Sequence, residues 1–167
     1  MTFHFRHARS EDLPAIVAIY NASIPSGRAT ADTQPVSVES RRAWFEAHQE
    51  TSRPLVVATV DGVMVGWTSL QDFYGRPAYR RTAEVSTYVA PEHHGKGVGS
   101  ALRAHILALC PSLDVSCVVS FVFATNTASI RLNRKFGFSV WGTLPAVAQV
   151  QGESVDLWIT GRHLDKP

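Results

Sequence analysis

The chain contains little cysteine, no long hydrophobic run and almost no net charge. Its two cysteines, Cys110 and Cys117, are too few for a disulfide framework. The longest apolar runs, such as residues 115–124, have the length of a strand and are interrupted by serine, so we expect no membrane span. A formal net charge of +2 at pH 7 is too small to indicate nucleic acid or a membrane surface as a partner. We therefore expect a cytoplasmic protein.

The composition is that of an ordinary globular protein. Apolar residues make up 45% and charged residues 18% of the 167 positions, a length that allows one domain with its own core. No repeat, linker or low-complexity segment divides the chain. We expect a single domain over residues 1–167.

Apolar periodicity predicts strands alternating with helices. The expected strands cover residues 3–9, 54–60, 63–73, 82–90, 115–124, 138–144 and 154–160. The expected helices follow Ser10 as N-cap, cover residues 37–49 and 98–109, and follow Asn126 as N-cap, with Gly137 ending the last one. A loop over residues 24–36 separates the first two helices, and loops of that length are often functional. This order predicts one mixed α/β domain.

The stretch from Thr82 to Ala101 is the most informative one. A strand ends at Pro91, glycines follow at positions 95, 97 and 99, and helical spacing then begins at Val98. A strand, a glycine turn and a helix N-terminus concentrate unpaired N–H groups, which the helix dipole makes attractive to an anion. The stretch therefore predicts a phosphate or pyrophosphate loop.

The spacing of the glycines distinguishes this loop from two common phosphate-binding motifs. It lacks the Gly-Lys-Ser/Thr ending of a Walker loop and the G-x-G-x-x-G of a dinucleotide fingerprint. The run from His94 to Gly99 instead resembles the acetyl-CoA loop of the GNAT superfamily of N-acetyltransferases, Arg/Gln-x-x-Gly-x-Gly, with His94 in the Arg/Gln place. The strings IYNASI, TADTQPVSVESRRAWF, RPAYRRTAEVSTYV and NTASIRLNRKFGF are similar to the phosphinothricin and methionine sulfone (sulfoximine) acetyltransferase family. The resemblance implies an α/β single-domain GNAT fold, with a mixed, mostly antiparallel central sheet flanked by helices.

The resemblance also implies a reaction in which an amine attacks the thioester of acetyl-CoA directly. A protonated amine is not a nucleophile, so a general base is needed. Glu84 matches the family's catalytic glutamate, and strand alternation puts it on one face with Ser86 and Tyr88. The alternative is a structural Glu84 paired with Arg80 or Arg81.

Further residues match the family's binding positions. For acetyl-CoA these are Thr87, Tyr88, Val89, His94, Gly95, Lys96, Gly97, Val98, Gly99, Ser100, Asn126 and Lys135. For the acceptor they are Arg76, Pro77, Ala78, Glu84, Val85 and Ser86, with Arg76 suited to a carboxylate or phosphinate. Asn126 could be only a helix cap, Lys135 only a solvated lysine and Arg76 only a surface arginine. His93 and His94 lack further ligands at metal spacing, and we expect no metal.

Departures from the family pattern concern the leaving group and the acceptor. Asn133 stands where many GNAT enzymes have a tyrosine that protonates the thiolate, and an amide is a poor acid. Ala148, Val150 and Ser154 replace the family's Gly, Lys and Trp, while Leu144, Pro145 and Asp156 remain. These changes leave the acceptor less defined than the reaction.

The leading hypothesis is acetylation of the α-amine of a small amino acid analogue by a homodimer, as the resemblance implies. The alternatives are another metabolite amine or a protein N-terminus as acceptor, and a non-catalytic acetyl-CoA-binding module.

Overall fold

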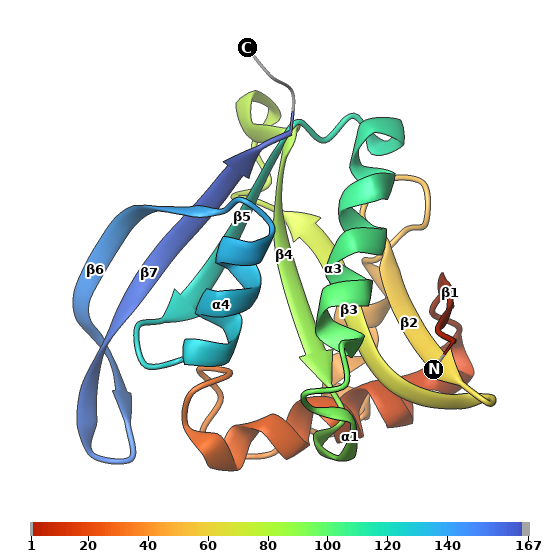
Figure 1. The fold of residues 1–167 in the computed structure, drawn as a ribbon, viewed down its shortest axis with the longest axis horizontal. Coiled ribbons are helices and arrows are strands. Elements are labelled where there is room, and N and C mark those ends of the chain that lie inside the picture. The colour runs from red at the N-terminus through yellow and green to blue at the C-terminus, as the bar shows by residue number, and fades with distance from the viewer. Residues whose placement is uncertain (1, 165–167) are drawn as a thin grey trace.

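A computed structural model describes residues 2–164 of the chain and contains one seven-stranded sheet in the order β1-β2-β3-β4-β5-β7-β6 (Figure 1). The strands are β1 (His4–His7), β2 (Leu55–Val60), β3 (Val63–Asp72), β4 (Thr82–Val89), β5 (Cys117–Phe123), β6 (Ser139–Val150) and β7 (Glu153–His163). The helices are α1 (Leu13–Ser23), α2 (Arg42–Glu46), α3 (Val98–Leu109) and α4 (Thr127–Lys135). Short 3-10 turns lie at Ser10–Asp12, Ile24–Ser26, Glu39–Arg41, Pro77–Tyr79, Pro91–His93 and Cys110–Leu113.

The sheet is mixed and mostly antiparallel, as predicted. Its parallel neighbours are β4 and β5, which are joined through α3; every other neighbouring pair is antiparallel. A crossover through a helix is what a parallel pair requires. The order of strands and helices along the chain also agrees with the prediction.

Helices cover both faces of the sheet. Ile16 and Ile19 of α1 pack with Trp67, whose indole Nε1 donates a hydrogen bond of 3.1 Å to the Ile16 carbonyl. Val98 and Leu102 of α3 pack in a separate cluster with strand residues, and Figure 1 shows α3 and α4 side by side on one face. Burial of each large apolar side chain contributes about 1.5–3 kcal/mol, so both layers stabilise the sheet between them.

Two predicted helix boundaries were wrong. Ser10 does not cap the first helix, because the Asp12 carboxylate accepts the Arg9 N–H at 2.7 Å and α1 begins only at Leu13. The helix predicted over residues 37–49 is shortened to α2 and the preceding 3-10 turn. Gln49 pairs with Arg53 in an antiparallel bridge, which takes its backbone out of the helix.

The closing hairpin is longer than predicted. β6 continues past Leu144 to Val150, although Pro145 cannot donate a ladder hydrogen bond. The register shifts between Leu144 and Ala148, and β6 is an edge strand, where such a bulge tolerates proline.

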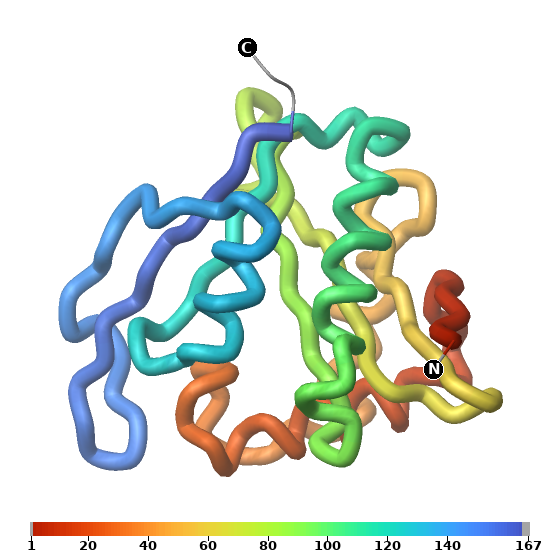
Figure 2. The backbone as a smooth tube through the Cα atoms, viewed as in Figure 1, coloured from red at the N-terminus to blue at the C-terminus, as the bar shows by residue number. Residues whose placement is uncertain are grey.

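The long loop over residues 24–36 packs against the far end of that hairpin. In Figure 2 it runs below α4 towards the turn between β6 and β7. The Gln151 amide donates to the Pro25 carbonyl at 3.1 Å, and a Cβ on Gly27 would lie 2.9 Å from Val150 Cγ1. The loop is therefore fixed beside the sheet at the place where β4 and β5 separate.

Candidate active site

The separation of β4 and β5 creates a cleft in the sheet. The two strands pair only from Thr82–Glu84 to Cys117–Val119 and then diverge (Figure 1). Between them lies a cleft of about 380 Å³, which we call the β4–β5 cleft. Past Glu84, the edge of β4 that faces β5 has no neighbouring strand, so alternate backbone groups point into the cleft. Such an edge can bind an extended ligand as an added strand.

The glycine loop lies where β4 ends and α3 begins. Gly95 and Gly97 have φ angles of +74° and +86°, a conformation that side chains disfavour, and α3 starts immediately afterwards. The His94 ring nitrogen Nε2 lies 2.9 Å from the Val89 carbonyl oxygen, which ties the loop to the end of β4. The first-turn N–H groups of α3 are thereby presented as an anion site.

α4 contributes a cation at its C-terminal end and a capping residue at its N-terminal end. The Lys135 ammonium donates to Ser100 Oγ at 3.1 Å, so this lysine lies beside the first turn of α3. At the other end of α4, Asn126 Oδ1 accepts the Ser129 N–H at 3.1 Å, which confirms the predicted N-cap. Asn126 also lines the β4–β5 cleft, so capping and a contact with a ligand are compatible.

Gly99, in the first turn of α3, faces both β4 and α4. A Cβ at this position would lie 3.6 Å from Val89 Cγ2 and 3.8 Å from Leu132 Cδ2. Leu132 lines the β4–β5 cleft. A larger side chain at Gly99 would therefore enter the gap between strand and helix.

Glu84 lies at the closed end of the cleft and is the last residue of β4 that pairs with β5. The Gln71 amide donates a hydrogen bond of 2.9 Å to its Oε2. Burial raises the pKa of the Glu84 carboxyl, and the hydrogen bond from Gln71 opposes that rise. The prediction that a structural Glu84 would pair with Arg80 or Arg81 was wrong, because both arginines form ion pairs with Asp114.

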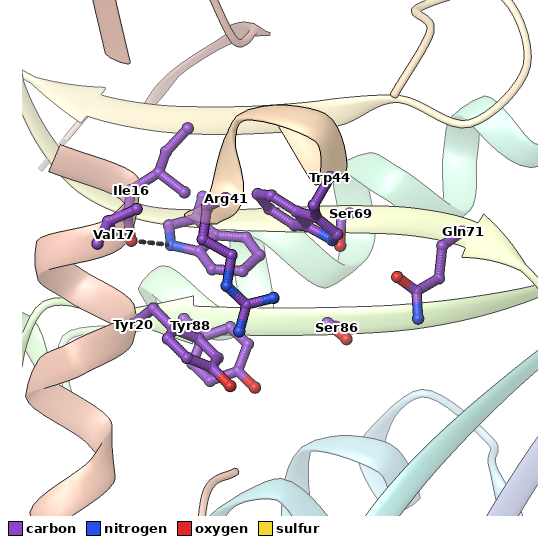
Figure 3. A pocket seen from close by; sticks show the side chains of 10 residues that line it. Ile16, Val17, Tyr20, Arg41, Trp44, Ser69, Gln71, Ser86 and Tyr88 are labelled. Carbon is purple, nitrogen blue, oxygen red and sulfur yellow. Dashed lines mark hydrogen bonds between the residues drawn. The ribbon is translucent and has the colours of Figure 1, made fainter. Parts of the chain in front are cut away.

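A second cavity lies over β3 and β4, beneath α1 and α2 (Figure 3). It has a volume of about 170 Å³ and is lined by Ile16, Val17, Tyr20, Arg41, Trp44, Trp67, Ser69, Gln71, Ser86 and Tyr88. We call it the Arg41 pocket, because the Arg41 side chain extends from the turn before α2 and places its guanidinium in the centre of the cavity.

The charge of Arg41 is held by several groups. Its Nη2 donates to Asp32 at 2.8 Å, and its guanidinium carbon lies 4.7 Å from the centre of the Tyr20 ring. The Tyr20 hydroxyl donates to the same Asp32. The long loop, through Asp32, therefore fixes the position of Arg41.

Ser86 and Tyr88 line both cavities. The Arg41 pocket also reaches Gln71, the hydrogen-bond partner of Glu84. Burial raises the pKa of the Tyr88 phenol, so Tyr88 stays protonated at neutral pH. The two cavities meet along a single strand, with one carboxylate near their junction.

The predicted site residues are brought together only in part. Six line the β4–β5 cleft: Glu84, Val85, Ser86, Thr87, Tyr88 and Asn126. Val89, residues 94–100 and Lys135 gather at the glycine loop, as described above. Arg76, Pro77 and Ala78 are exposed and line neither cavity.

Sequence reasoning missed Arg41 and Arg103. Arg103 is buried in α3 and lines the β4–β5 cleft. No pattern separated Arg41 from its neighbour Arg42. Arg103 directly follows the core residue Leu102, and adjacent residues on a helix point in different directions, so this spacing did not indicate its burial either.

Among residues 2–164, no group of three or more His, Cys, Asp or Glu side chains is arranged to hold a metal ion. Within the same residues, no helix is both long and apolar enough to cross a membrane.

Comparison with known proteins gives consistent matches. Residues 14–138 match the family model described as the acetyltransferase (GNAT) family. The chain is 47% identical over 160 residues to Bacillus subtilis YwnH, named as a candidate phosphinothricin acetyltransferase, covering 95% of this chain and 98% of that protein. It is 33% identical to the L-methionine sulfoximine/L-methionine sulfone acetyltransferase of Pseudomonas paraeruginosa, covering 99% and 96%.

A solved structure matches over the whole length of the chain. The phosphinothricin acetyltransferase of Sinorhizobium meliloti, crystallised in complex with acetyl-CoA, superposes with a TM-score of 0.92 at 31% identity. The match covers 100% of this chain and 94% of that one.

Proposed function

Because the chain belongs to the acetyltransferase (GNAT) family and is an acyltransferase, we propose that it acetylates the α-amine of a small amino acid analogue with acetyl-CoA. Phosphinothricin, methionine sulfone and methionine sulfoximine are the first candidate acceptors, since relatives carry those names. The observation that carries the proposal is the junction of the β4–β5 cleft with the Arg41 pocket at Ser86 and Tyr88.

The β4–β5 cleft fits the acetyl donor. Its free strand edge suits the amide-bearing arm of acetyl-CoA, and the N–H groups after Gly97 suit its pyrophosphate. Lys135 adds a positive charge beside that helix end. A backbone N–H of β4 would polarise the thioester carbonyl where the strand edge is free.

The Arg41 pocket fits the acceptor. A planar guanidinium binds a carboxylate or phosphinate through two parallel hydrogen bonds. The aromatic walls of Tyr20, Trp44 and Trp67 enclose a short side chain. We therefore assign acceptor binding to Arg41, while Arg76 would reach an acceptor only if a second subunit brought it near.

Glu84 is the proposed general base. It lies at the closed end of the cleft, next to Ser86, and burial raises its pKa towards the range in which a carboxylate takes up protons effectively. The attacking amine would lose its proton to Glu84, directly or through one water.

We also propose a cytoplasmic homodimer that needs no metal. Exposed apolar side chains gather on β6 and in the segment before β4: Tyr74, Tyr79, Val140, Trp141, Leu144 and Val147. Sedimentation analysis would test the dimer, and activity after treatment with EDTA would test metal independence. A monomer at micromolar concentration, or loss of activity that zinc or magnesium restores, would contradict these points.

The decisive experiment is thiol release from acetyl-CoA against a panel of amines. The panel contains phosphinothricin, methionine sulfone, methionine sulfoximine, plain amino acids and a peptide with a free N-terminus. Turnover on the amino acid analogues supports the proposal. Turnover on the peptide alone would instead indicate that the acceptor is a protein N-terminus. Binding of acetyl-CoA without turnover on any amine would indicate a binding module.

A further inference from the structure

Arg103 is a buried cation without a counterion. Its residue surface is only 3% exposed, and no carboxylate of residues 2–164 forms an ion pair with it. Burial lowers the pKa of Arg103 to about 10, so the side chain remains charged at neutral pH. Burying an unpaired charge is costly, and a role in the site would explain why the fold tolerates it.

The groups around the guanidinium are neutral. Nη1 donates to Asn133 Oδ1 at 2.8 Å and Nη2 donates to Thr87 Oγ1 at 3.3 Å. The guanidinium carbon lies 5.3 Å from the centre of the Phe138 ring. Nε is buried and has no hydrogen-bond partner among the described residues. The positive charge is therefore held in place but not cancelled.

Asn133 is itself oriented by a chain of hydrogen bonds. Its Nδ2 donates to Thr160 Oγ1 at 3.0 Å, and the Thr160 hydroxyl donates to the Ser120 carbonyl at 3.0 Å. An arginine can only donate, so the amide must present its oxygen to Arg103. Asn133 is 2% exposed and acts as a fixed neutral acceptor rather than as an acid.

The position of Arg103 along the cleft is the decisive point. It lines the β4–β5 cleft together with Glu84 and contacts Thr87, the residue between the two that line both cavities. If the acceptor amine comes from the Arg41 pocket, the acetyl group must lie beside residues 86–88 of β4 to meet it. The other titratable side chains that line the cleft are Arg28, Glu84 and Tyr88, and Arg28 is exposed on the long loop.

We propose that the guanidinium of Arg103 stabilises the thiolate of CoA as it leaves, with Asn133 as its positioning residue. This inference rests on the proposed function. The amine nitrogen forms a bond to the acetyl carbon, the carbon–sulfur bond breaks, and its electron pair goes to sulfur. The amine proton passes to Glu84, and the thiolate later takes a proton from solvent. Arg103 gives up no proton and serves only as a fixed positive charge.

The test is the ionisation of the CoA thiol in its complex with the enzyme, followed by ultraviolet absorbance against pH. An opposite charge within a few ångströms favours the ionised form, so bound CoA should ionise about 1–3 pH units below free CoA. Replacing Asn133→Asp keeps the shape of the side chain but pairs Arg103 with a carboxylate. The folded variant should then bind CoA with a thiol that ionises as in free CoA.

Kinetics supply the second measurement. N133D and Arg103→Met should lower kcat by roughly 10²–10³-fold, the loss expected when one electrostatic stabiliser is removed, with KM for acetyl-CoA little changed. Arg103→Lys should recover part of kcat. Arg134→Met, on the exposed side of α4, is the matched control and should change neither quantity.

The outcomes distinguish a failure of the proposed acetyltransferase function from a failure of the proposed role of Arg103. If CoA does not bind, the proposed function fails and the inference fails with it. If CoA binds but its thiol ionises as in solution, only the role of Arg103 is overturned. If N133D folds and keeps wild-type kcat, Arg103 is a structural residue, and this result holds even if R103M does not fold.

Discussion

Gln71 and Glu84 are directly opposite each other on β3 and β4, and the Gln71 amide nitrogen lies 2.9 Å from Glu84 Oε2. A carboxylate only accepts hydrogen bonds, so this contact favours the ionised form of Glu84 and lowers its pKa. Burial acts in the opposite direction and is the larger effect. The pair therefore sets the pH at which Glu84 can accept a proton.

Replacing Gln71→Met should move the acidic limb of activity to higher pH. Without the amide, nothing opposes the rise in the Glu84 pKa that burial causes, so a higher pH is needed to ionise the base. The pH profile of kcat, measured at saturating concentrations of both substrates, checks this shift. A limb that stays in place or moves to lower pH would show that Glu84 does not govern it.

Replacing Glu84→Gln should lower kcat/KM by roughly 10²–10⁴-fold near neutral pH, because the amide keeps the shape but cannot accept a proton. The deficit should become smaller as the pH approaches the pKa of the acceptor amine, where the free amine is abundant. Initial rates across this pH range test both statements. Near-normal activity of E84Q at pH 7 would assign the base to another group.

Replacing Gly99→Val should raise KM for acetyl-CoA while the fold persists. The new side chain enters the gap between Val89 and Leu132, which glycine leaves open. Gly97 is less suitable for this test, because its φ of +86° would add backbone strain for any other residue. Ala104→Val, on the exposed face of α3, introduces the same side chain away from the cleft. If G99V and A104V have equal KM values for acetyl-CoA, the acetyl donor does not occupy this gap.

The strands and the glycine loop could be predicted because their signals are local. Alternating apolar residues and the glycines at positions 95 and 97 each specify backbone geometry over a few residues. The end of α2 could not be predicted, since it depends on a bridge between Gln49 and Arg53. The hydrogen-bond partner of Glu84 could not be predicted either, because the register of β3 on β4 decides which residue lies opposite Glu84.

The Arg41 pocket illustrates the same limit for the site. Its walls come from α1, the turn before α2, β3 and β4, and no spacing in the sequence links these segments. Arg76 drew attention because its string matched a family, yet its side chain is exposed. The family strings indicated an acetyltransferase, whereas the proposal that Arg41 rather than Arg76 binds the acceptor depends on the fold.

The final prediction compares those two arginines. Arg41→Gln should raise KM for an anionic acceptor by roughly 10–150-fold, the loss of a charge-assisted hydrogen bond worth about 1.5–3 kcal/mol. KM for acetyl-CoA should change little, because Arg41 lines the Arg41 pocket and does not line the β4–β5 cleft. Arg41→Lys should recover little, since a point charge cannot reproduce the planar fork.

Arg76→Ala is the matched comparison, with both substrates varied in each assay. In a single subunit Arg76 is exposed and lines neither cavity, so its removal should leave both KM values near the wild type. A large rise in the acceptor KM of R76A, lost when the proposed dimer is diluted to monomers, would mean that a second subunit brings Arg76 to the acceptor. If R41Q instead raises only the KM for acetyl-CoA, Arg41 belongs to the donor site and the small-anion acceptor loses its main support.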